Sequence, residues 1–437
     1  MFYNMNLNLF QKFSAVFFLI ALSVSTSVCQ TNDKKPSAET KKADGNLPKV
    51  VHFDKPQTFQ YKPENLPAPF ATESARRNSK IVAQPENAIL NLPKGFQINV
   101  FAEGDFKYPR WMALAPNGDV FVADSRANSI IVLRDKNKDG TADERFIFAE
   151  NLSQPFGMAF HKDWFYVANT DSVVRFKYKT GQTKAEAAPE KIIELTEGGY
   201  NQHWTRNLIF SPDGTRLFVS IGSATNASVE ADPRRAAISV YDADGKNHRV
   251  FASGLRNPIG LAFNPANSEL WTAVNERDGL GDDLVPDYIT SVKDGGFYGF
   301  PFAYIGQNEE PRLKGKSPEM VKKTIVPDVL LTSHSAALGI VFYDGKMFPK
   351  QYNGDAFVAL HGSWNREKLT GYKIIRVNFE NGKLAGNSYE DFLTGWLPDE
   401  TSNEVWGRPV GLLVNSDGSL LIADDGAKKI WRVSYKK

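Results

Sequence analysis

The sequence predicts an all-β fold, a six-bladed β-propeller, and three observations lead to this expectation. A unit made of a turn with Pro or Gly, a short apolar strand, a polar hairpin and a second apolar strand occurs six times. Each copy is followed by one or two more strand-like runs, such as "SIIVLRD" and "ERFIFAE" after the first, which gives about four strands per repeat. No long amphipathic helix interrupts the pattern. Such repeats are typical of propeller blades.

The six copies align with one another from residue 108 onward. They begin at Tyr108, Ser153, His203, Arg256, Ser335 and Gly407, and their inner strands align at Met112, Gly157, Asn207, Gly260, Gly339 and Gly411. The successive spacings are 45, 50, 53, 79 and 72 residues. A tandem of two smaller β domains is the alternative, but it does not explain a single repeated unit.

One strand-like run has no blade of its own. It is "KGFQINVFAE", residues 94–103, and it precedes the first copy. We expect it to supply the outer strand of the blade formed by residues 407–435, which closes the ring and removes two sheet edges. The propeller is therefore expected over residues 91–437.

The first 29 residues indicate a secretory signal peptide. Residues 13–28 are an apolar run too short to span a bilayer well, and Lys12 precedes them. Lipidation of Cys29 would make the protein a lipoprotein, although Thr26 and Val28 fit the usual lipidation motif poorly. The alternative is ordinary cleavage near Ser27 or Cys29 and a soluble exported protein. We therefore expect a periplasmic or lipid-anchored envelope protein, with residues 30–90 as a disordered tether and N-terminal extension.

Composition excludes several classes of function. The chain carries 52 basic and 50 acidic residues, a net charge of +2, so neither nucleic acid nor an anionic membrane surface is an expected partner. Cys29 is the only cysteine, which excludes an intrachain disulfide, a CxxCH haem site and cysteine-based zinc sites. No segment resembles a nucleotide-binding βαβ unit, so NAD is not expected.

Basic residues recur just before the aligned positions, where the turns leading into the inner strands should converge at one end of the central channel. They are Arg110, His203 with Arg206, Arg256 with Asn257, His334 and Arg408, with Gln154 in the second copy. Like charges repel across a channel unless an anion lies between them, and guanidinium groups suit carboxylates and phosphates. A solvated turn explains any one arginine as well, but it explains the set poorly.

The same set suggests a role for His203. Neighbouring arginines disfavour the imidazolium form, so this side chain would be a neutral proton acceptor near pH 7, as a general base must be. Trp204 beside it could help to exclude water.

Long motifs in the second half of the chain match a known family. "HWTRNLIFSPDGTRLFVSIGSATN", "SGLRNPIGLAF", "VNERDGLGDDLVPDY", "DGGFYGFPFAYIG", "ALHGSWNREKLTGYKIIRV" and "GRPVGLLV" resemble the sorbosone dehydrogenase group. That group is similar to soluble quinoprotein glucose and aldose sugar dehydrogenases, six-bladed propellers that use pyrroloquinoline quinone (PQQ) with calcium. The resemblance runs from about Phe70 to the C-terminus.

The resemblance implies roles for individual residues. His203 matches the histidine that takes the proton from the substrate hydroxyl while hydride passes to the quinone. Arg256 and Asn257 match a pair that contacts the quinone, and Arg408 matches a contact to a cofactor carboxylate. Gly279 and Leu280 fall where backbone carbonyls hold the cofactor-bound calcium, although this loop departs from the family's pattern.

Four further residues are expected at the cofactor. Arg366 sits where the sugar dehydrogenases place a cationic contact from the fifth blade. Arg110 stands where they present a polar contact, so its identity departs from theirs and bears on substrate choice. Arg206 and His334 are expected to contribute to anion binding and to lie near the pocket.

A second calcium site is suggested by "DKNKDGTADE", residues 135–144. Asp135, Asn137, Asp139 and Asp143 alternate as oxygen donors, and Gly140 falls at the sixth position. An EF-hand needs a Glu at position twelve, where this chain has Phe146, and the flanking runs are strands. The alternative is a solvated turn rich in Asp and Asn.

These observations favour an exported, PQQ- and calcium-dependent dehydrogenase that oxidises an aldose, a sorbosone-like sugar aldehyde or a related polyol. Electrons would pass to a separate acceptor, because the chain has no haem or iron–sulfur ligands. The alternative is a non-catalytic propeller that binds a carbohydrate or protein partner on its channel face. A calcium-dependent lactonase would need a Glu, Asp and Asn ring where the sequence offers Arg and His.

Overall fold

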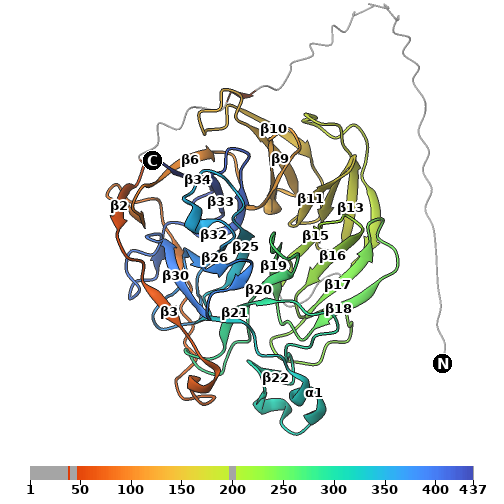
Figure 1. The fold of residues 1–437 in the computed structure, drawn as a ribbon, viewed down its shortest axis with the longest axis vertical. Coiled ribbons are helices and arrows are strands. Elements are labelled where there is room, and N and C mark those ends of the chain that lie inside the picture. Colours follow the sequence, from red (N-terminus) through yellow and green to blue (C-terminus); the bar gives the residue numbers. More distant parts are fainter. Residues whose placement is uncertain (1–37, 40–46, 196–202, 437) are drawn as a thin grey trace, which may run out of the picture. The chain divides into compact units, whose positions relative to one another are not determined.

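The computed structural model describes residues 38–39, 47–195 and 203–436, which belong to one compact unit, Ser37–Lys437. The expected signal peptide, Cys29 and most of the polar tether up to residue 46 lie outside the described residues. No helix in the described ranges has the length and apolar character needed to cross a membrane. Six sheets of four main strands stand around a common centre, which confirms the predicted six-bladed propeller (Figure 1).

The first three blades follow the chain in order, from the inner strand outward. The first has β7 (Pro109–Leu114), β8 (Val120–Asp124), β9 (Ser129–Arg134) and β10 (Glu144–Ala149), with β1 (Ala38–Glu39) paired to β10. The second has β11 (Met158–His161), β12 (Trp164–Ala168), β13 (Ser172–Lys177) and β14 (Glu190–Glu194). The third has β15 (Arg206–Phe210), β16 (Arg216–Ile221), β17 (Ala237–Asp242) and β18 (Arg249–Ser253).

The other three blades carry the insertions. The fourth has β19 (Pro258–Phe263), β20 (Leu270–Val274), β21 (Pro286–Ser291) and β24 (Val329–Ser333), with β22 (Ala303–Tyr304), β23 (Asn308–Glu309) and α1 (Pro318–Lys323) inserted. The fifth has β25 (Ala337–Phe342), β26 (Ala356–Leu360), β27 (Lys373–Val377) and β30 (Ser388–Leu393), with a small hairpin of β28 (Phe379–Glu380) and β29 (Lys383–Leu384). The sixth has β32 (Pro409–Val414), β33 (Leu420–Asp424) and β34 (Lys429–Tyr435).

The ring closes as the sequence predicts. The outer strand of the sixth blade is β6 (Phe96–Glu103), which pairs antiparallel with β34. Phe96 is fully buried there, and its ring makes edge contacts with Phe348, Tyr352, Phe392 and Tyr435. The N-terminal and C-terminal ends of the propeller therefore share one sheet and one core.

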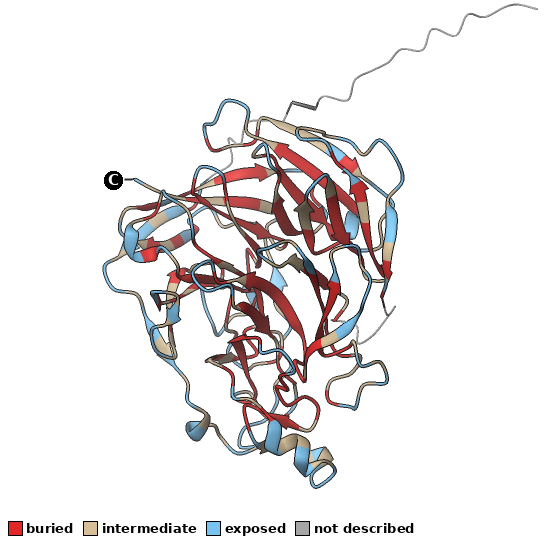
Figure 2. Cartoon of the chain, turned by 45° about the vertical axis from the view of Figure 1, so that its right-hand side comes forward, coloured by how far each residue is buried: buried red, intermediate tan, exposed pale blue. Residues whose placement is uncertain are grey.

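The inner strands contact one another in a closed cycle, and small residues let them approach. A Cβ atom on Gly260 would lie 2.3 Å from the carbonyl oxygen of Leu338 in the next blade, and one on Gly411 would lie 2.5 Å from that of Arg110. These aligned glycines therefore serve close packing at the centre of the ring. Buried residues dominate the strands, whereas many residues of the hairpin tips and loops are exposed (Figure 2).

The N-terminal extension is structured from Leu47 onward, which differs from the disorder expected over residues 30–90. Its β2 (Lys49–Phe53) pairs with β5 (Ile89–Pro93), and β3 (Thr58–Gln60) adds a fifth strand to the fifth blade. Its β4 (Lys80–Ile81) pairs with β31 (Glu404–Val405). The expectation failed because these polar segments take their backbone partners from distant parts of the chain.

Candidate active site

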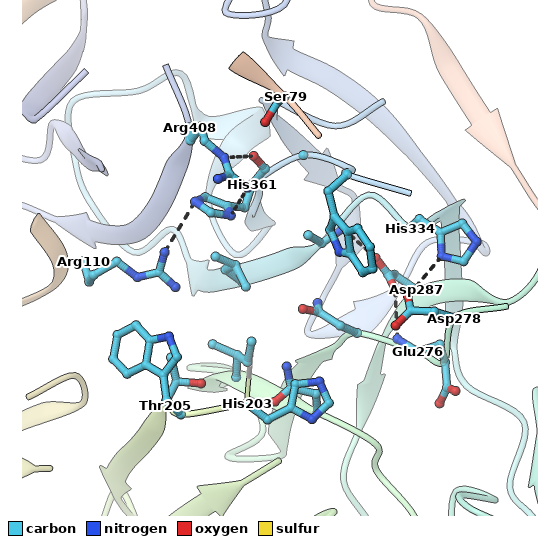
Figure 3. Close-up of a pocket in the computed structure, with 18 of the residues that line it drawn as sticks. Ser79, Arg110, His203, Thr205, Glu276, Asp278, Asp287, His334, His361 and Arg408 are labelled. Carbon is cyan, nitrogen blue, oxygen red and sulfur yellow. Dashed lines mark hydrogen bonds and ion pairs between the residues drawn. The ribbon is translucent and has the colours of Figure 1, made fainter. Parts of the chain in front are cut away.

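A cavity of about 390 Å³ opens where the turns into the inner strands converge. Residues from several blades line it, as the repeat predicts. Among the sequence-predicted residues, six line the cavity: Arg110, His203, Arg256, Asn257, His334 and Arg408. Figure 3 shows Arg110 and His361 across the cavity from Asp278 and His334, with His203 and Thr205 on a third side.

His203 is buried, and its hydrogen bonds define its tautomer. Its Nδ1 atom lies 3.0 Å from both the carbonyl oxygen and the hydroxyl oxygen of Ser223. The Ser223 hydroxyl donates its own proton to the carbonyl oxygen of Thr225 at 2.6 Å, so toward His203 it acts as an acceptor. Nδ1 therefore carries the proton, and Nε2 is the basic nitrogen.

The electrostatic surroundings keep the His203 imidazole neutral. Burial lowers its pKa well below the ordinary value, and the positive charge of Arg256 lowers it further. Arg206 and Arg235 contribute in the same direction. A neutral imidazole with a defined basic nitrogen at a cavity wall has the chemistry of a proton acceptor.

Arg256 lines the cavity, but its guanidinium group is already engaged by the protein. It donates to the carbonyl oxygen of Asn226 at 3.0 Å and to that of Glu276 at 2.6 Å. It also donates to the Asn226 side chain at 2.8 Å and pairs with Asp278 at 3.1 Å. Arg256 can therefore influence the chemistry in the cavity mainly through its positive charge.

The side-chain oxygen of the neighbouring Asn257 is buried and has no hydrogen-bond partner in the described part of the chain.

A second buried network holds Arg110 and Arg408. The Arg110 guanidinium pairs with Asp425, and the Asp425 carboxylate accepts a hydrogen bond from His361 Nε2 at 3.0 Å. Arg408 donates to His361 Nδ1 at 3.0 Å. Burial, followed by the charge of Arg408, lowers the pKa of His361 to about 3, and the interactions with His361 and Arg110 outweigh burial and hold the pKa of Asp425 well below its usual range. A neutral His361 thus connects an ionised Asp425 to Arg408.

Two predicted cofactor contacts do not line the cavity. Arg206 is fully buried at the start of β15, where it donates to the carbonyl oxygens of His203 and Thr205, both at 3.0 Å. It therefore supports the turn that carries His203. Arg366 donates to the carbonyl oxygen of Asp282 at 2.7 Å and pairs with Asp283, so it ties two surface loops together.

The residues expected to hold the cofactor-bound calcium also lie outside the cavity lining. The carbonyl oxygen of Leu280 accepts a hydrogen bond from the Phe70 amide at 2.7 Å, and Gly279 is exposed beside it. His334, which does line the cavity, donates from Nε2 to the carbonyl oxygen of Gly281 at 3.0 Å. The N-terminal extension therefore engages one of the two carbonyl oxygens that were expected to face the metal.

In the loop expected to bind a second calcium ion, the carboxylate oxygens accept hydrogen bonds from other groups of the same loop. The Asp135 carboxylate accepts from the amides of Asp139 and Gly140, at 3.2 and 2.9 Å. Asp143 accepts from the Asn137 side chain at 3.0 Å, and Asp139 accepts from the Thr141 amide at 2.9 Å. Within residues 47–195 and 203–436, no group of three or more His, Cys, Asp or Glu side chains is arranged to hold a metal ion. These hydrogen bonds are those of a turn built on Asp and Asn, and calcium binding by this loop stays a prediction.

Sequence reasoning missed an acidic wall of the cavity. It consists of Glu276, Asp278 and Asp287, which follow β20 or begin β21. Burial raises the pKa of Glu276 to about 7 and that of Asp287 to about 6. All three lie in the motif "VNERDGLGDDLVPDY", where their position at the inner ends of neighbouring strands was the signal that could have found them.

Sequence reasoning also missed His361 and the contribution of the N-terminal extension. His361 follows β26, and the repeat assigns no polar residue there. Arg76, Asn78 and Ser79 line the cavity from outside the six repeats. No periodic pattern could have placed them.

Comparison with known proteins shows the family of this chain. The TrAA12-like family matches residues 90–288 and 310–436. The chain belongs to the TrAA12-like family. The match begins at residue 90, later than the resemblance expected from about Phe70.

Three proteins illustrate what the chain is similar to. The AA12 structure from Trichoderma reesei superposes with a TM-score of 0.68 at 20% identity, over 82% of this chain and 100% of the other. The PQQ-dependent pyranose dehydrogenase of Coprinopsis cinerea is 26% identical over 52% of this chain and 39% of its own length. An uncharacterised protein of Borreliella burgdorferi is 28% identical over 82% of this chain and 94% of its own. The relatives with a named activity support the quinoprotein resemblance at the family level.

Proposed function

We propose that the protein is an exported, PQQ-dependent dehydrogenase that oxidises a sugar or a sugar aldehyde such as a sorbosone-like compound. The observation that carries the proposal is His203, a neutral imidazole with its proton on Nδ1, at the wall of a cavity lined by arginines. Membership of the TrAA12-like family supports the cofactor, because a relative with a named activity is a PQQ-dependent pyranose dehydrogenase.

The residues of the cavity fit a planar, triply carboxylated quinone. Its volume of about 390 Å³ falls in the range of small-molecule sites, roughly 300–1,000 Å³. The aromatic side chains of Tyr108, Trp204 and Trp364 line it and can pack against a ring system. Arg408 forms no ion pair within the described residues, and the orphaned Asn257 oxygen is a second polar group without a partner. Arg408 and Asn257 would hold the cofactor.

The protein's own groups supply the proton chemistry. Nε2 of His203 would accept the proton of the substrate hydroxyl, since Nδ1 is committed to Ser223. Burial, reinforced by the charge of Arg256, keeps the imidazole neutral before the reaction, and Asp278 and two carbonyl oxygens hold Arg256 in place. When bound, PQQ would supply the two-electron acceptor, and an accompanying calcium ion would polarise its carbonyl groups. The aromatic wall would limit the access of water.

The remaining parts of the proposal follow from the sequence and the family. Calcium would accompany the quinone, as the family resemblance implies. Electrons would leave to a separate acceptor. Export would follow from the N-terminal signal, with a lipid anchor at Cys29 as the one link to a membrane.

Reconstitution tests the proposal. Purified protein is titrated with PQQ and calcium, and dye reduction is followed with a panel of aldoses, pyranoses and sugar aldehydes. We expect a cofactor-dependent absorbance change and dye reduction that His203→Ala abolishes and His52→Ala, an exposed histidine on β2, retains. Absence of both signals, or equal turnover by the two variants, would favour the non-catalytic propeller instead.

A further inference from the structure

A segment outside the family match contributes to the cavity. We call residues 70–81 the N-terminal strap. The TrAA12-like family begins to match at residue 90, yet Arg76, Asn78 and Ser79 of the strap line the cavity together with residues of the blades. Figure 3 shows Ser79 above the cavity, near Arg408. This wall therefore lies outside the segments that the family model matches.

Hydrogen bonds to three blades fix the N-terminal strap. Ala75 donates its amide to the Asp282 carboxylate at 2.9 Å, in the loop of the fourth blade. The Arg77 amide donates to the carbonyl oxygen of Trp364 in the fifth blade at 2.8 Å. The Lys80 amide donates to that of Asn403 at 2.6 Å, beside the sixth blade. Because the residues on both sides of Arg76 are anchored, its position over the cavity is preorganised.

Two arginines at the cavity lining are exposed and carry no carboxylate partner within the described residues. Arg76 lies over the ring of Trp364, 5.8 Å from its centroid, and Arg126 of the first blade lies over the ring of Tyr108 at 4.1 Å. The buried Arg110 and Arg256 differ, because each is already paired with an aspartate. Stacking orders a guanidinium group but leaves its N–H donors available.

We propose that Arg76 and Arg126 form a subsite for an anionic group of the substrate, a carboxylate or a phosphate, and that acidic sugars are the preferred substrate class. Unpaired guanidinium groups at a cavity lining attract an anion and can bind it through two parallel hydrogen bonds. We assign the cofactor's carboxylates to Arg408, because it is partly buried beside the Arg110–Asp425 pair, whereas Arg76 and Arg126 are exposed. The reaction catalysed rests on the proposed function, whereas the binding of an acidic sugar does not.

Direct binding measurements test the subsite. Calorimetry compares D-glucuronate, glucose 6-phosphate and glucose on the full chain, with and without PQQ and calcium. We expect the wild type to bind one of the two anionic sugars at least about tenfold more tightly than glucose, since a hydrogen bond to a charged group contributes roughly 1.5–3 kcal/mol. The preference should weaken as the salt concentration rises.

Variants assign the preference to the two arginines. Arg76→Gln and Arg126→Gln should each reduce the ratio of anionic-sugar to glucose affinity by about tenfold. The control Arg216→Gln, at an exposed hairpin of the third blade, should leave the ratio unchanged. Circular dichroism and melting temperature verify folding, which these exposed positions are not expected to disturb.

Several outcomes overturn the subsite. They are equal affinity for charged and neutral sugars, an unchanged ratio in Arg76→Gln and Arg126→Gln, or a loss of PQQ affinity in these variants without loss of anionic-sugar binding. The last outcome would assign the arginines to the cofactor. Arginine-dependent binding of an acidic sugar without any turnover would contradict the proposed function alone. Turnover of neutral sugars without the preference would contradict the subsite alone.

Discussion

The Nδ1 atom of His203 lies 3.0 Å from the carbonyl oxygen of Ser223, two residues after the end of the neighbouring strand β16. A carbonyl oxygen can only accept, so this contact places the imidazole proton on Nδ1 without reference to any ligand. The repeat brings the histidine to the cavity, and the backbone of the next strand sets its tautomer. The first two predictions depend on this relationship.

Replacement of His203 should abolish most of the chemistry while sparing cofactor binding. His203→Ala is expected to lower kcat by about 10²–10⁴-fold, the usual contribution of a positioned general base. Stopped-flow reduction of the PQQ-loaded protein measures it, and PQQ affinity measured separately should change little. A variant with wild-type kcat would remove His203 from the mechanism.

The pH profile should lack the ordinary histidine step. The pKa of His203 is lowered well below 6.5, so the basic form is present on both sides of pH 6.5, and kcat/KM should not fall there because of this residue. Any inflection between pH 6 and 7 should come from the acidic wall, where Glu276 and Asp287 have pKa values of about 7 and about 6. An inflection near 6.5 that survives in both Glu276→Gln and Asp287→Asn would contradict this assignment.

Glu276 should destabilise the fold as the pH rises. Its pKa in the folded protein is raised to about 7, above the ordinary 4.5, so the stability it contributes is complete below pH 4.5 and is lost as the pH rises through 7. At ~1.4 kcal/mol per pKa unit, Glu276→Gln should gain about 2 kcal/mol relative to wild type between pH 5 and pH 8. Urea unfolding at the two pH values measures it. The exposed control Glu64→Gln should show no such gain, and parallel behaviour of the two variants would refute the expectation.

The Arg110–Asp425 pair should be costly to break. Both side chains are almost completely buried, and removal of one partner leaves an uncompensated charge. Asp425→Ala is expected to lower the free energy of unfolding by about 3–5 kcal/mol, while Asp417→Ala, whose pair with Arg432 is partly exposed, should cost at most about 1 kcal/mol. Equal losses in urea unfolding would show that burial does not set the cost of either pair.

Ring closure should depend on Phe96. Phe96→Ala removes a fully buried ring in contact with four other aromatic rings, and a cost of about 3–5 kcal/mol is expected. Gln97→Ala, on the exposed side of the same strand, is the matched control. If chemical denaturation gives the two variants the same midpoint, β6 does not hold the sixth blade.

The sequence was informative wherever a feature repeats. Aligned glycines such as Gly260 and Gly411 mark close packing at the axis, and the unassigned run at residues 94–103 had to pair with the last blade. The same alignment brought His203, Arg256 and Arg408 to one cavity. A repeat encodes which segment lies at the channel, because each blade uses the same geometry.

The sequence was uninformative about side-chain direction and about segments outside the repeat. Arg206 follows His203 by three residues, yet its side chain does not reach the cavity and instead donates hydrogen bonds to two carbonyl oxygens of the turn. The N-terminal strap reaches the cavity through contacts such as that of Ser74 Oγ with the Gly281 amide, between residues about two hundred positions apart. Local propensity carries no signal for such contacts.

The pairing of β6 with β34 also orders events during synthesis. Residues 96–103 leave the ribosome early, whereas their partner, residues 429–435, follows only after all the other blades have been made. Until then β6 is an unpaired strand whose apolar face, including Phe96, has no core to enter. The last blade can therefore assemble only after β34 has been synthesised. A shortened chain without β34 would expose the unpaired edge of β6, which would favour aggregation.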